Sequence, residues 1–429
     1  MKKKICTCFL MTVIGLSSLY AQNWRLIKPA YPTKDAFVAG YSVTDFGAKG
    51  DGITDDTESF QKGLNSLTNV GPSKVNGGIR FVPAGKYVIK GNLNIPKGET
   101  IRGEWKKPEK GQPIEGTILM AYAGRGDENA TPLITMEPAA GVMDLAIWYP
   151  EQTPDNIVPY PASIVMGKPK HFGNEYCNVK NITLVNSYIG IAISRVNGGG
   201  CPVFYDIYGS PLSVGIEIDY IADVGRIDRV DFSPAYWCGS GLPDSPAAGG
   251  SFDKWIYENG TGIMMRRNDW SYTCYVSIEG YHTGFNAAPS TASPGSFPNG
   301  HNYELSFKNC KNAVKIDAIS NAGILFSKIH IDDCDNGFVI SPGVGATLHM
   351  MGCDISTNQN AITTDKEAST RVMMQSCEIK EGEININGGI LSCTSCDFNN
   401  SSPQIHIGTN AQYIITGNRF KEACNIDNK

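Results

Sequence analysis

Short runs of alternating apolar and polar residues recur along the chain, and most end in a cluster of Gly, Asn, Asp or Ser. Examples in the C-terminal half are ELSFKNC, KIHIDDC, TLHMMGC and RVMMQSC. Alternation with a period of two predicts β-strands that bury one face, and few segments show the spacing of an amphipathic helix. The runs recur every 20–25 residues or so, roughly the period of a stacked solenoid. The pattern therefore favours a parallel β-helix, an all-β fold in which each unit forms one coil.

Cysteines follow the same repeat. Five of them are separated by 24, 19, 24 and 19 residues: Cys310, Cys334, Cys353, Cys377 and Cys396. Because equivalent positions of successive coils stack about 4.8 Å apart, we expect these side chains to form one ladder. Disulfides prefer Cβ atoms about 3.8 Å apart, so buried free thiols are expected rather than a disulfide framework. Cys393 and Cys396 have no second pair or nearby histidines at zinc spacing, so no metal site is predicted.

The first residues have the layout of a secretory signal peptide. Three lysines at positions 2–4 precede an apolar run from Ile5 to Leu16, which is too short to span a membrane. We expect residues 1–21 to be this signal, and the protein to be exported to the periplasm or the extracellular space.

The remaining residues, 22–429, are expected to form a single β-helix domain. An N-terminal cap occupies 22–70 and the coils occupy 75–429. Two long stretches rich in Gly, Pro and Ser, near 234–260 and 286–302, are expected insertions in the coils.

Composition excludes two classes of partner. Charged residues make up 18% of the chain and the net charge is −5, with no basic stripe. This balance argues against a nucleic-acid partner. Beyond the signal no apolar run approaches membrane length, so no membrane span is expected.

The stretch 45–60, DFGAKGDGITDDTESF, contains four aspartates and a glutamate. It does not fit a calcium loop, because the sequence from Asp51 lacks an oxygen ligand at the third position and a glycine at the sixth. Thr54 or Asp55 can instead cap a helix at this point. Apolar residues then recur at helical spacing: Phe60, Leu64 and Leu67. We therefore interpret the acidic stretch as the start of a capping helix.

The residues from Val43 to Gln61, V-x-D-F-G-A-x-G-D-G-x-x-D-D-T-x-x-F-Q, resemble the N-terminal signature of the pectate-lyase-like superfamily. The segments GGIRFVPAGKYVI and LNIPKGETIRG continue the resemblance. The superfamily includes polygalacturonase-like hydrolases, exo-β-1,3-glucanase-like enzymes and phage tailspikes. The resemblance implies a single-stranded, right-handed parallel β-helix with an N-terminal capping helix, and a polysaccharide or oligosaccharide partner. It also implies a monomer or a trimer, because trimers occur among the relatives.

The catalytic motifs N-T-D, G-H-G and R-I-K of the polygalacturonases are absent, so no catalytic set is carried over. We interpret the adjacent pair Asp332 and Asp333 as part of a turn. The candidate site must therefore come from the coil pattern itself.

To find residues that share a face, we took one apolar residue of each strand as inward: Leu184, Ile207, Phe232, Ile278, Phe307 and Ile331. Alternation then gives one outward row: Thr183, Asp206, Asp231, Ser277, Ser306 and His330. Glu279 falls in the neighbouring outward row, one coil beyond Asp231, with the two carboxyls roughly 5–9 Å apart. Such a pair is what glycoside hydrolysis requires. Asp206 and Asp269 are alternative members of the pair.

Between the two insertions lies the densest polar and aromatic stretch of the chain, from Met264 to Phe285. Its candidates, with one aromatic residue from the first insertion, are substrate-binding residues: Arg266, Arg267, Trp237, Trp270, Tyr272, Tyr281 and His282. Flat aromatic rings suit stacking on sugars. The alternative is that the aromatics pack the loops onto the coils and that the arginines pair with the acids.

Three functions remain open at this point, and an exported glycoside hydrolase that degrades a polysaccharide is the leading one. A glycoside hydrolase would need no cofactor. A polysaccharide lyase would neutralise a uronate with Ca²⁺ or Arg and abstract a proton with Lys, Arg or Tyr. A non-catalytic, tailspike-like protein would bind the glycan only.

Overall fold

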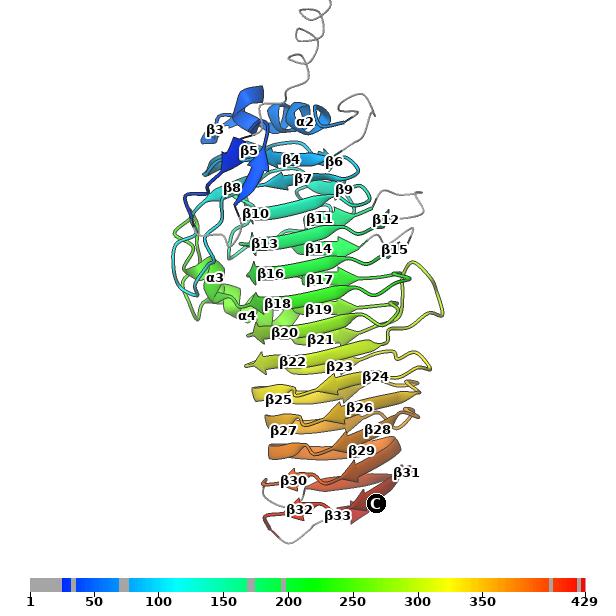
Figure 1. The fold of residues 1–429 in the computed structure, drawn as a ribbon. Helices are drawn as coiled ribbons and strands as arrows, with labels where there is room; N and C mark the ends of the chain where they lie inside the picture. Colours follow the sequence, from blue (N-terminus) through cyan, green and yellow to red (C-terminus); the bar gives the residue numbers. More distant parts are fainter. Residues whose placement is uncertain are drawn as a thin grey trace, which may run out of the picture.

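The computed structural model describes residues 25–31, 36–68, 77–167, 174–193, 198–400, 404–422 and 426–428. The expected signal peptide lies outside the described residues. Figure 1 shows one column of stacked strands, with the N-terminal helix α2 at one end and the last strands at the other. Among the described residues, no helix has the length and apolar character needed to cross a bilayer.

From the N-terminus to the first insertion the elements are β1 (Arg25–Ile27), β2 (Phe37–Ala39), the 3-10 helix η1 (Val43–Phe46), β3 (Asp51–Asp55), α2 (Thr57–Asn65), β4 (Gly78–Phe81), β5 (Gly85–Ile89), β6 (Leu93–Ile95), β7 (Glu99–Arg102), β8 (Thr117–Ala121), β9 (Ile134–Met136), β10 (Gly141–Trp148), β11 (Ala162–Met166), β12 (Asn174–Glu175), β13 (Asn178–Leu184), β14 (Ile189–Ile193), β15 (Gly199–Gly200), β16 (Val203–Gly209), β17 (Val214–Ile218) and β18 (Arg226–Phe232). They continue with α3 (Ala235–Cys238), α4 (Ser251–Asn259), β19 (Thr261–Met265), β20 (Tyr272–Glu279), β21 (Thr283–Ala287), β22 (Gly300–Lys308), β23 (Asn312–Ile316), β24 (Ile324–Ser327), β25 (His330–Ile340), β26 (Thr347–Met351), β27 (Asp354–Thr364), β28 (Arg371–Gln375), β29 (Glu378–Thr394), β30 (Asp397–Phe398), β31 (Ile405–Thr416), β32 (Arg419–Phe420) and β33 (Ile426–Asn428).

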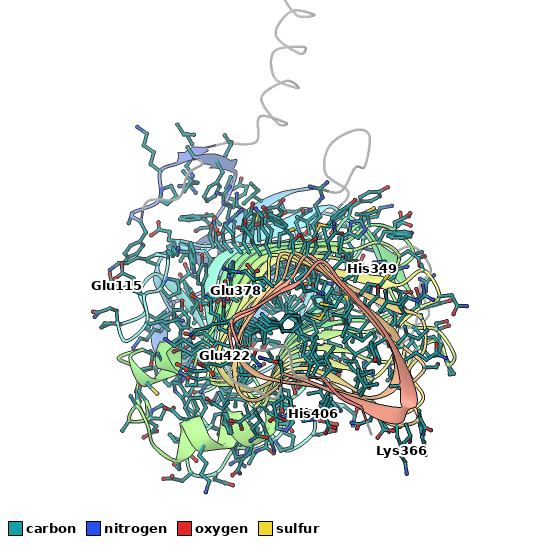
Figure 2. The ribbon with its side chains drawn as sticks, turned by 90° about the horizontal axis from the view of Figure 1, so that it is seen from below. Glu115, His349, Lys366, Glu378, His406 and Glu422 are labelled. Carbon is teal, nitrogen blue, oxygen red and sulfur yellow. The ribbon has the colours of Figure 1, made fainter. Side chains whose placement is uncertain are left out.

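Parallel pairing between successive coils builds the column. Within the described residues, 29 strands form one continuous sheet. Apolar residues stack at the inward positions, as where Val230 of β18 opposes Val276 of β20, and both are buried. Seen along the axis, the coils superimpose, and α3 and α4 lie outside them on one side (Figure 2). The right-handed parallel β-helix expected from the sequence is confirmed.

A row of residues with positive φ bends the long strands. The row, called the corner row below, consists of Asp144, Asn181, Asp206, Arg229, Tyr275 and Glu304, with φ between 52° and 60°. Pairing of the flanking residues places each member beside the next. Asp and Asn tolerate this left-handed conformation better than most residues. Each bend turns the two halves of a strand onto adjacent faces of the coil.

The predicted register is wrong by two residues in β16. The alternation pattern matched Ile207 to Leu184, but Leu184 pairs with Gly209. A Cβ at Gly209 would come within 1.9 Å of the Leu184 carbonyl oxygen, so this inward position has no apolar side chain to mark it in the sequence. Consequently Tyr208 takes the outward position predicted for Asp206. The rest of the row is confirmed, because Asp231, Ser277, Ser306 and His330 pair in succession.

The cysteines form two stacks instead of the single ladder expected. Cys310 stacks on Cys334, whose sulfur accepts a hydrogen bond from the Cys310 backbone N–H at 3.4 Å. Cys353, Cys377 and Cys396 form the second stack, in which the Cys377 N–H donates to the Cys396 sulfur at 3.4 Å. One coil in this region has 24 residues, so the interval of 19 residues between Cys334 and Cys353 starts a new position on the coil. Every cysteine in the described part of the chain is a free thiol, which agrees with the expectation for the five repeat cysteines.

A ladder of asparagine amides joins the C-terminal coils. The Asn336 Nδ2 donates to the Asn312 Oδ1 at 3.2 Å, and the Asn360 Nδ2 donates to the Asn336 Oδ1 at 2.8 Å. The Asn385 Nδ2 donates to the Asn360 Oδ1 at 2.7 Å. Each amide therefore donates to one coil and accepts from the next, which fixes the register of four successive coils.

The acids of the N-terminal signature satisfy backbone groups. Asp56 is fully buried and accepts hydrogen bonds from the N–H groups of Lys49 and Gly50, at 2.7 and 3.1 Å. Asp51 accepts from the backbone and hydroxyl of Thr54 at 2.8 Å. The sequence predicts Thr54 or Asp55 as the helix cap, whereas α2 begins directly after Asp56. Asp51 and Asp56 thus satisfy backbone groups of the loop before α2, and the interpretation of the stretch as a helix cap stays a prediction.

Replacing Asn360 by alanine should destabilise the column. The change removes two amide hydrogen bonds and leaves Asn336 and Asn385 each without one partner, so we expect a loss of about 1–3 kcal/mol in the free energy of unfolding. Denaturant titration of the purified variant measures this loss. Gln359→Ala, at an exposed neighbouring position, is the control. A variant at residue 360 as stable as this control would contradict a role of the ladder in stability.

A second stability prediction concerns Glu99, the first residue of β7, which is fully buried. The Thr68 hydroxyl donates to its Oε1 at 3.1 Å, while its Oε2 has no hydrogen-bond partner among the described residues. Burial raises the pKa of Glu99 to about 7, although Thr68 and Arg80 act in the opposite direction.

The Glu99 carboxyl therefore holds its proton more tightly in the folded protein than in the unfolded chain, where its pKa is near 4.5. The contribution of protonated Glu99 to the free energy of unfolding is fully present below about pH 4.5 and is lost as the pH rises through about 7. We expect that loss to reach the order of 2 kcal/mol by about pH 8. Glu99→Gln should remove this part of the pH dependence in thermal unfolding, whereas the exposed Glu128→Gln should not. Parallel pH profiles for wild type and Glu99→Gln would disprove the assignment.

Candidate functional site

Two insertions meet on one side of the column. The insertion between β18 and β19 carries α3 and α4, and the loop 103–116 between β7 and β8 packs on it. The Gly111 N–H donates to the Ala235 carbonyl at 3.1 Å, and the Ile114 N–H donates to the Ser240 carbonyl at 3.0 Å. Figure 2 shows Glu115 of this loop on the same side of the coils as α3 and α4. The candidate site lies where these two insertions cover the ends of β18 and β20.

The centre of the candidate site is a pair of carboxylates on successive coils. Asp231 lies near the end of β18, directly opposite Ser277 of β20, and Glu279 follows two residues later. The Lys110 Nζ lies 3.2 Å from the Asp231 Oδ1 and 3.0 Å from the Glu279 Oε2. The two carboxylate oxygens are therefore no farther apart than the sum of these distances. The predicted proximity of Asp231 and Glu279 is confirmed, and their catalytic role stays a prediction.

Hydroxyl groups of the first insertion hold the same two carboxylates. The Tyr236 hydroxyl donates to the Asp231 Oδ2 at 3.0 Å, and the Ser233 hydroxyl donates to the Glu279 Oε2 at 3.3 Å. Burial raises the pKa of Tyr236, and the negative charge of Asp231 raises it further. Tyr236 therefore stays a protonated donor at neutral pH.

Lys110 supplies the positive charge of the site. Burial lowers the pKa of Lys110, but Asp231 and Glu279 together outweigh burial and raise it above its ordinary value. The ammonium thus stays charged and offsets one of the two negative charges of the ionised pair. Its side chain remains about one-third exposed, at 35%, so a ligand can reach it.

A small aromatic cluster lies beneath loop 103–116. Trp105, Tyr208 and Tyr236 are all buried and pack ring against ring, with centroids 5.9 and 6.2 Å apart. The Trp105 Nε1 donates to the Thr183 hydroxyl at 2.9 Å, which ties the loop to β13. This cluster fixes the position of the Tyr236 hydroxyl relative to Asp231.

A cavity of about 470 Å³ opens beside Glu279. It is bounded by the ends of β18 and β20 and by α3 and α4, and its polar lining residues are Ser233, Cys238, Asp253, Lys254, Tyr257, Glu279 and Asn309. This volume is within the usual range for small-ligand sites. Glu279 therefore borders both Lys110 and a space that accepts a ligand.

Several residues predicted for the site are held in ion pairs instead. Arg229 binds Asp206 through two contacts, at 2.8 and 3.1 Å. Arg267 lies 2.9 Å from Asp269. Arg266 lies 2.8 Å from the buried Glu217 and also donates to the carbonyl of Pro289. Asp206, Asp269, Arg266 and Arg267 are thus each held in an ion pair, and their predicted role in a site stays a prediction.

The predicted stacking residues divide into two groups. Trp237 is fully buried against Phe252, with centroids 4.7 Å apart. Tyr281 is also fully buried and donates to the Pro211 carbonyl at 2.8 Å. Neither ring offers a face to a ligand, so both predictions are wrong: the apolar rings fill the space under the insertion.

The other candidate side chains lie elsewhere. Trp270 and Tyr272 are exposed and lie just before and at the beginning of β20, at the opposite end of the strand from Glu279. His282 follows β20 and contacts the Thr283 hydroxyl at 3.0 Å. Burial lowers the pKa of His282, and Lys311 and Lys315 lower it further. The structure thus brings none of these three side chains to the carboxylate pair.

Sequence reasoning missed Lys110, Tyr236 and Ser233. Lys110 comes from a loop more than one hundred residues before its partners, and no periodicity links that loop to β18 and β20. The sequence around Lys110 is the basic run KKPEKG at 106–111. Such a run is equally typical of an exposed loop without a binding role. Tyr236 and Ser233 are two of several polar residues in or next to the insertion. Only their contacts with Asp231 and Glu279 in the structure distinguish them from the others.

Comparison with known proteins supports the fold. Residues 40–122 match the family model described as rhamnogalacturonase A/epimerase, pectate lyase-like. The match contains the N-terminal signature and confirms the resemblance to the pectate-lyase-like superfamily over this segment. The chain has a pectate lyase-like fold.

Two curated proteins resemble short parts of the chain. The non-secreted LysM effector LysM19 of Penicillium expansum is 40% identical over 62 residues, 14% of this chain and 4% of that protein. Alginate lyase 7 of Azotobacter vinelandii is 39% identical over 87 residues, 20% of this chain and 8% of that protein. The matched part is thus less than a tenth of the length of either relative. Among solved structures, the catalytic unit of a GH87 alpha-1,3-glucanase from Streptomyces thermodiastaticus gives a TM-score of 0.49 with 12% identity, covering 90% of this chain and 71% of that one.

Lys110→Met should reveal the charge coupling at the site. Without the ammonium, Asp231 and Glu279 repel one another when both are ionised, and this repulsion weakens near about pH 4, where carboxyls take up protons. We expect a loss of stability of about 1 kcal/mol near neutral pH, because the groups are partly exposed, and a smaller loss near pH 4. Thermal unfolding at both pH values measures it. Lys106→Met, which breaks the exposed pair with Glu115, is the control; equal losses at both pH values would refute the coupling.

Proposed function

We propose that the chain is an exported polysaccharide-degrading enzyme, a glycoside hydrolase whose catalytic groups are Asp231 and Glu279. The observation that carries the proposal is the carboxylate pair, which shares Lys110 at the edge of a cavity of about 470 Å³. The pectate lyase-like fold and the match to part of an alginate lyase support a glycan as substrate. Export rests on the signal-like residues 1–21, and the assembly is a monomer or a trimer.

In this proposal Glu279 is the proton donor, because it borders the cavity. The bound glycan takes the contacts of Lys110, and once the ammonium leaves, repulsion between the two carboxyls favours a proton on one of them. Glu279 gives that proton to the glycosidic oxygen as the bond to the anomeric carbon breaks. Asp231, oriented by the Tyr236 hydroxyl, activates water or attacks the anomeric carbon itself.

A polysaccharide lyase is the second candidate, favoured by one specific observation: the charged Lys110 lies beside the pair. A lysine can neutralise a uronate carboxylate, but the buried, protonated Tyr236 cannot serve as the base that takes the proton from the carbon next to it. The calcium ion expected for some lyases needs six to eight oxygen ligands. The ammonium of Lys110 already occupies the space between the carboxylates, so these residues do not fit calcium and no step involves it.

Product analysis tests the proposal. We expect wild-type protein to release new reducing ends from at least one member of a broad polysaccharide panel, without the ultraviolet absorbance of unsaturated uronates. Asp231→Asn and Glu279→Gln should each lower the rate by roughly 10²–10⁴-fold, while glycan binding persists.

Exposed substitutions of the same chemistry, Asp244→Asn and Glu128→Gln, are the controls and should keep full activity. Unsaturated products would show that the protein is a lyase and would contradict the hydrolase proposal. Full activity in both site variants would remove Asp231 and Glu279 from the mechanism. Binding without turnover across the panel would favour a non-catalytic, tailspike-like glycan-binding protein.

A further inference from the structure

A strip of exposed and half-buried aromatic side chains lies on a different face from the carboxylate pair. It consists of Tyr205 of β16, Trp270 just before β20, Tyr272 and Tyr275 of β20, and His301 and Tyr303 of β22. Trp270, Tyr272 and Tyr275 are 48%, 39% and 50% exposed, although large aromatic residues elsewhere on the coils are mostly buried. The strip therefore presents several ring faces to solvent.

Strand pairing places the rings of the strip on neighbouring coils. Tyr272 lies opposite His301, and Cys274 lies opposite Tyr303. Trp270, Tyr272 and Tyr275, of which Tyr275 belongs to the corner row, follow one another along a single coil, across the axis of the column. His301 and Tyr303 lie one coil further, about 4.8 Å away, whereas Tyr205 lies two strands before β20 with Asp228 between it and Cys274. The strip is thus elongated across the coils, a shape suited to an extended ligand.

Edge-to-face contacts hold the rings in place. His301 lies between Trp270 and Tyr272, with centroids 5.7 and 5.6 Å away and interplanar angles of 80° and 84°. Tyr275 and Tyr303 meet at 5.8 Å and 89°. Rings fixed in this way lose little conformational freedom when a ligand binds.

Backbone conformation fixes the direction of two rings of the strip. Trp270 and Tyr275 have φ values of 58° and 55°, a left-handed region that disfavours bulky side chains. For Tyr275 this conformation follows from the bend of the corner row, so it is a property of the coil. Asp, Asn or Gly would occupy both positions with less strain.

The charges beside the strip are balanced. Arg229 binds Asp206 and Asp228, and Lys328 lies 3.7 Å from Glu304. Arg226, whose guanidinium lies 6.0 Å from the ring of Tyr272, faces Asp228. With three cations and three acids, the surface favours neither an anionic nor a cationic polymer. A ligand that stacks on aromatic faces and carries no charge fits it best.

We propose that this strip binds a neutral polysaccharide chain, at a site separate from the carboxylate pair. Tyr272 and Glu279 stand at opposite ends of a bent strand, at most about 23 Å apart along it, while Tyr275 at the bend lies closer to the carboxylate pair. The apolar faces of sugar rings would stack on Trp270, Tyr272 and Tyr275, while Arg226 and His301 donate hydrogen bonds to hydroxyls. The proposal shares with the proposed function only the choice of a glycan as ligand.

Native affinity electrophoresis tests the proposal without requiring turnover. The gels contain β-1,3-glucan, α-1,3-glucan, xylan or galactomannan as neutral probes, and alginate or polygalacturonate as acidic probes. We expect wild type to be retarded by at least one neutral probe. Trp270→Asn, Tyr272→Ala and Tyr275→Asn should each weaken that binding about tenfold, the usual effect of removing an aromatic contact of high energy. Tyr413→Ala, an exposed tyrosine on β31, should bind as wild type.

Thermal unfolding separates binding from folding. Asparagine accepts positive φ better than an aromatic residue, so Trp270→Asn and Tyr275→Asn should be at least as stable as wild type while binding less. Retardation of wild type by acidic probes only, or by none, would overturn the proposal. So would strip variants that bind all neutral probes as wild type does. Asp231→Asn and Glu279→Gln should leave this retardation unchanged, so failure of the hydrolase proposal is distinguishable from failure of this one.

Discussion

The register between successive coils is the constraint on which the rest of the structure depends. Parallel pairing sets one coil about 4.8 Å from the next, and a slip of a single residue would turn every inward side chain outward. Asp231 and Glu279 are distant in sequence, and they share Lys110 only because β18 and β20 pair with Asp231 opposite Ser277. The aromatic strip depends on the same pairing, through Tyr272 and His301. Both candidate sites are consequences of register.

Polar stacks secure that register where apolar packing alone would not. Contacts between stacked Leu, Ile and Val side chains tolerate small shifts of one coil against the next. A hydrogen bond between asparagine amides, such as that from Asn360 to Asn336, breaks if one coil slides. The buried Asp144 has the same effect near the N-terminus, because Arg102 and Asn181 both bind its carboxylate. A buried polar group without its partner costs about 1–3 kcal/mol. Slipped registers are therefore penalised at several heights of the column.

The sequence predicts the periodic part of this protein well. Strand alternation predicts the parallel β-helix, and it places Asp231 and Glu279 on neighbouring coils because Phe232 and Ile278 mark the inward positions. It fails where that mark is missing, as at Gly209, whose lack of a side chain shifted Asp206 into a position that belongs to Tyr208. It also fails where the interval between two cysteines differs from the local coil length, as the 19 residues from Cys334 to Cys353 do among coils of 24 residues, so that the five cysteines form two stacks. Lys110 could not be predicted, because only the folded loop 103–116 brings it to β18.

The assembly of the carboxylate site follows from Coulomb repulsion as much as from packing. Two carboxylates on neighbouring coils repel one another, and low-dielectric walls such as the buried Trp105, Tyr208 and Tyr236 strengthen that repulsion. Lys110 relieves it without joining the regular coil, since the residue belongs to a loop that can give up its contacts to a ligand while the strands stay paired. A lysine within the coil could not move in this way without disturbing the register. In the proposed hydrolase, placing the positive charge on an insertion lets the scaffold remain rigid while the charge balance of the pair changes when a glycan binds.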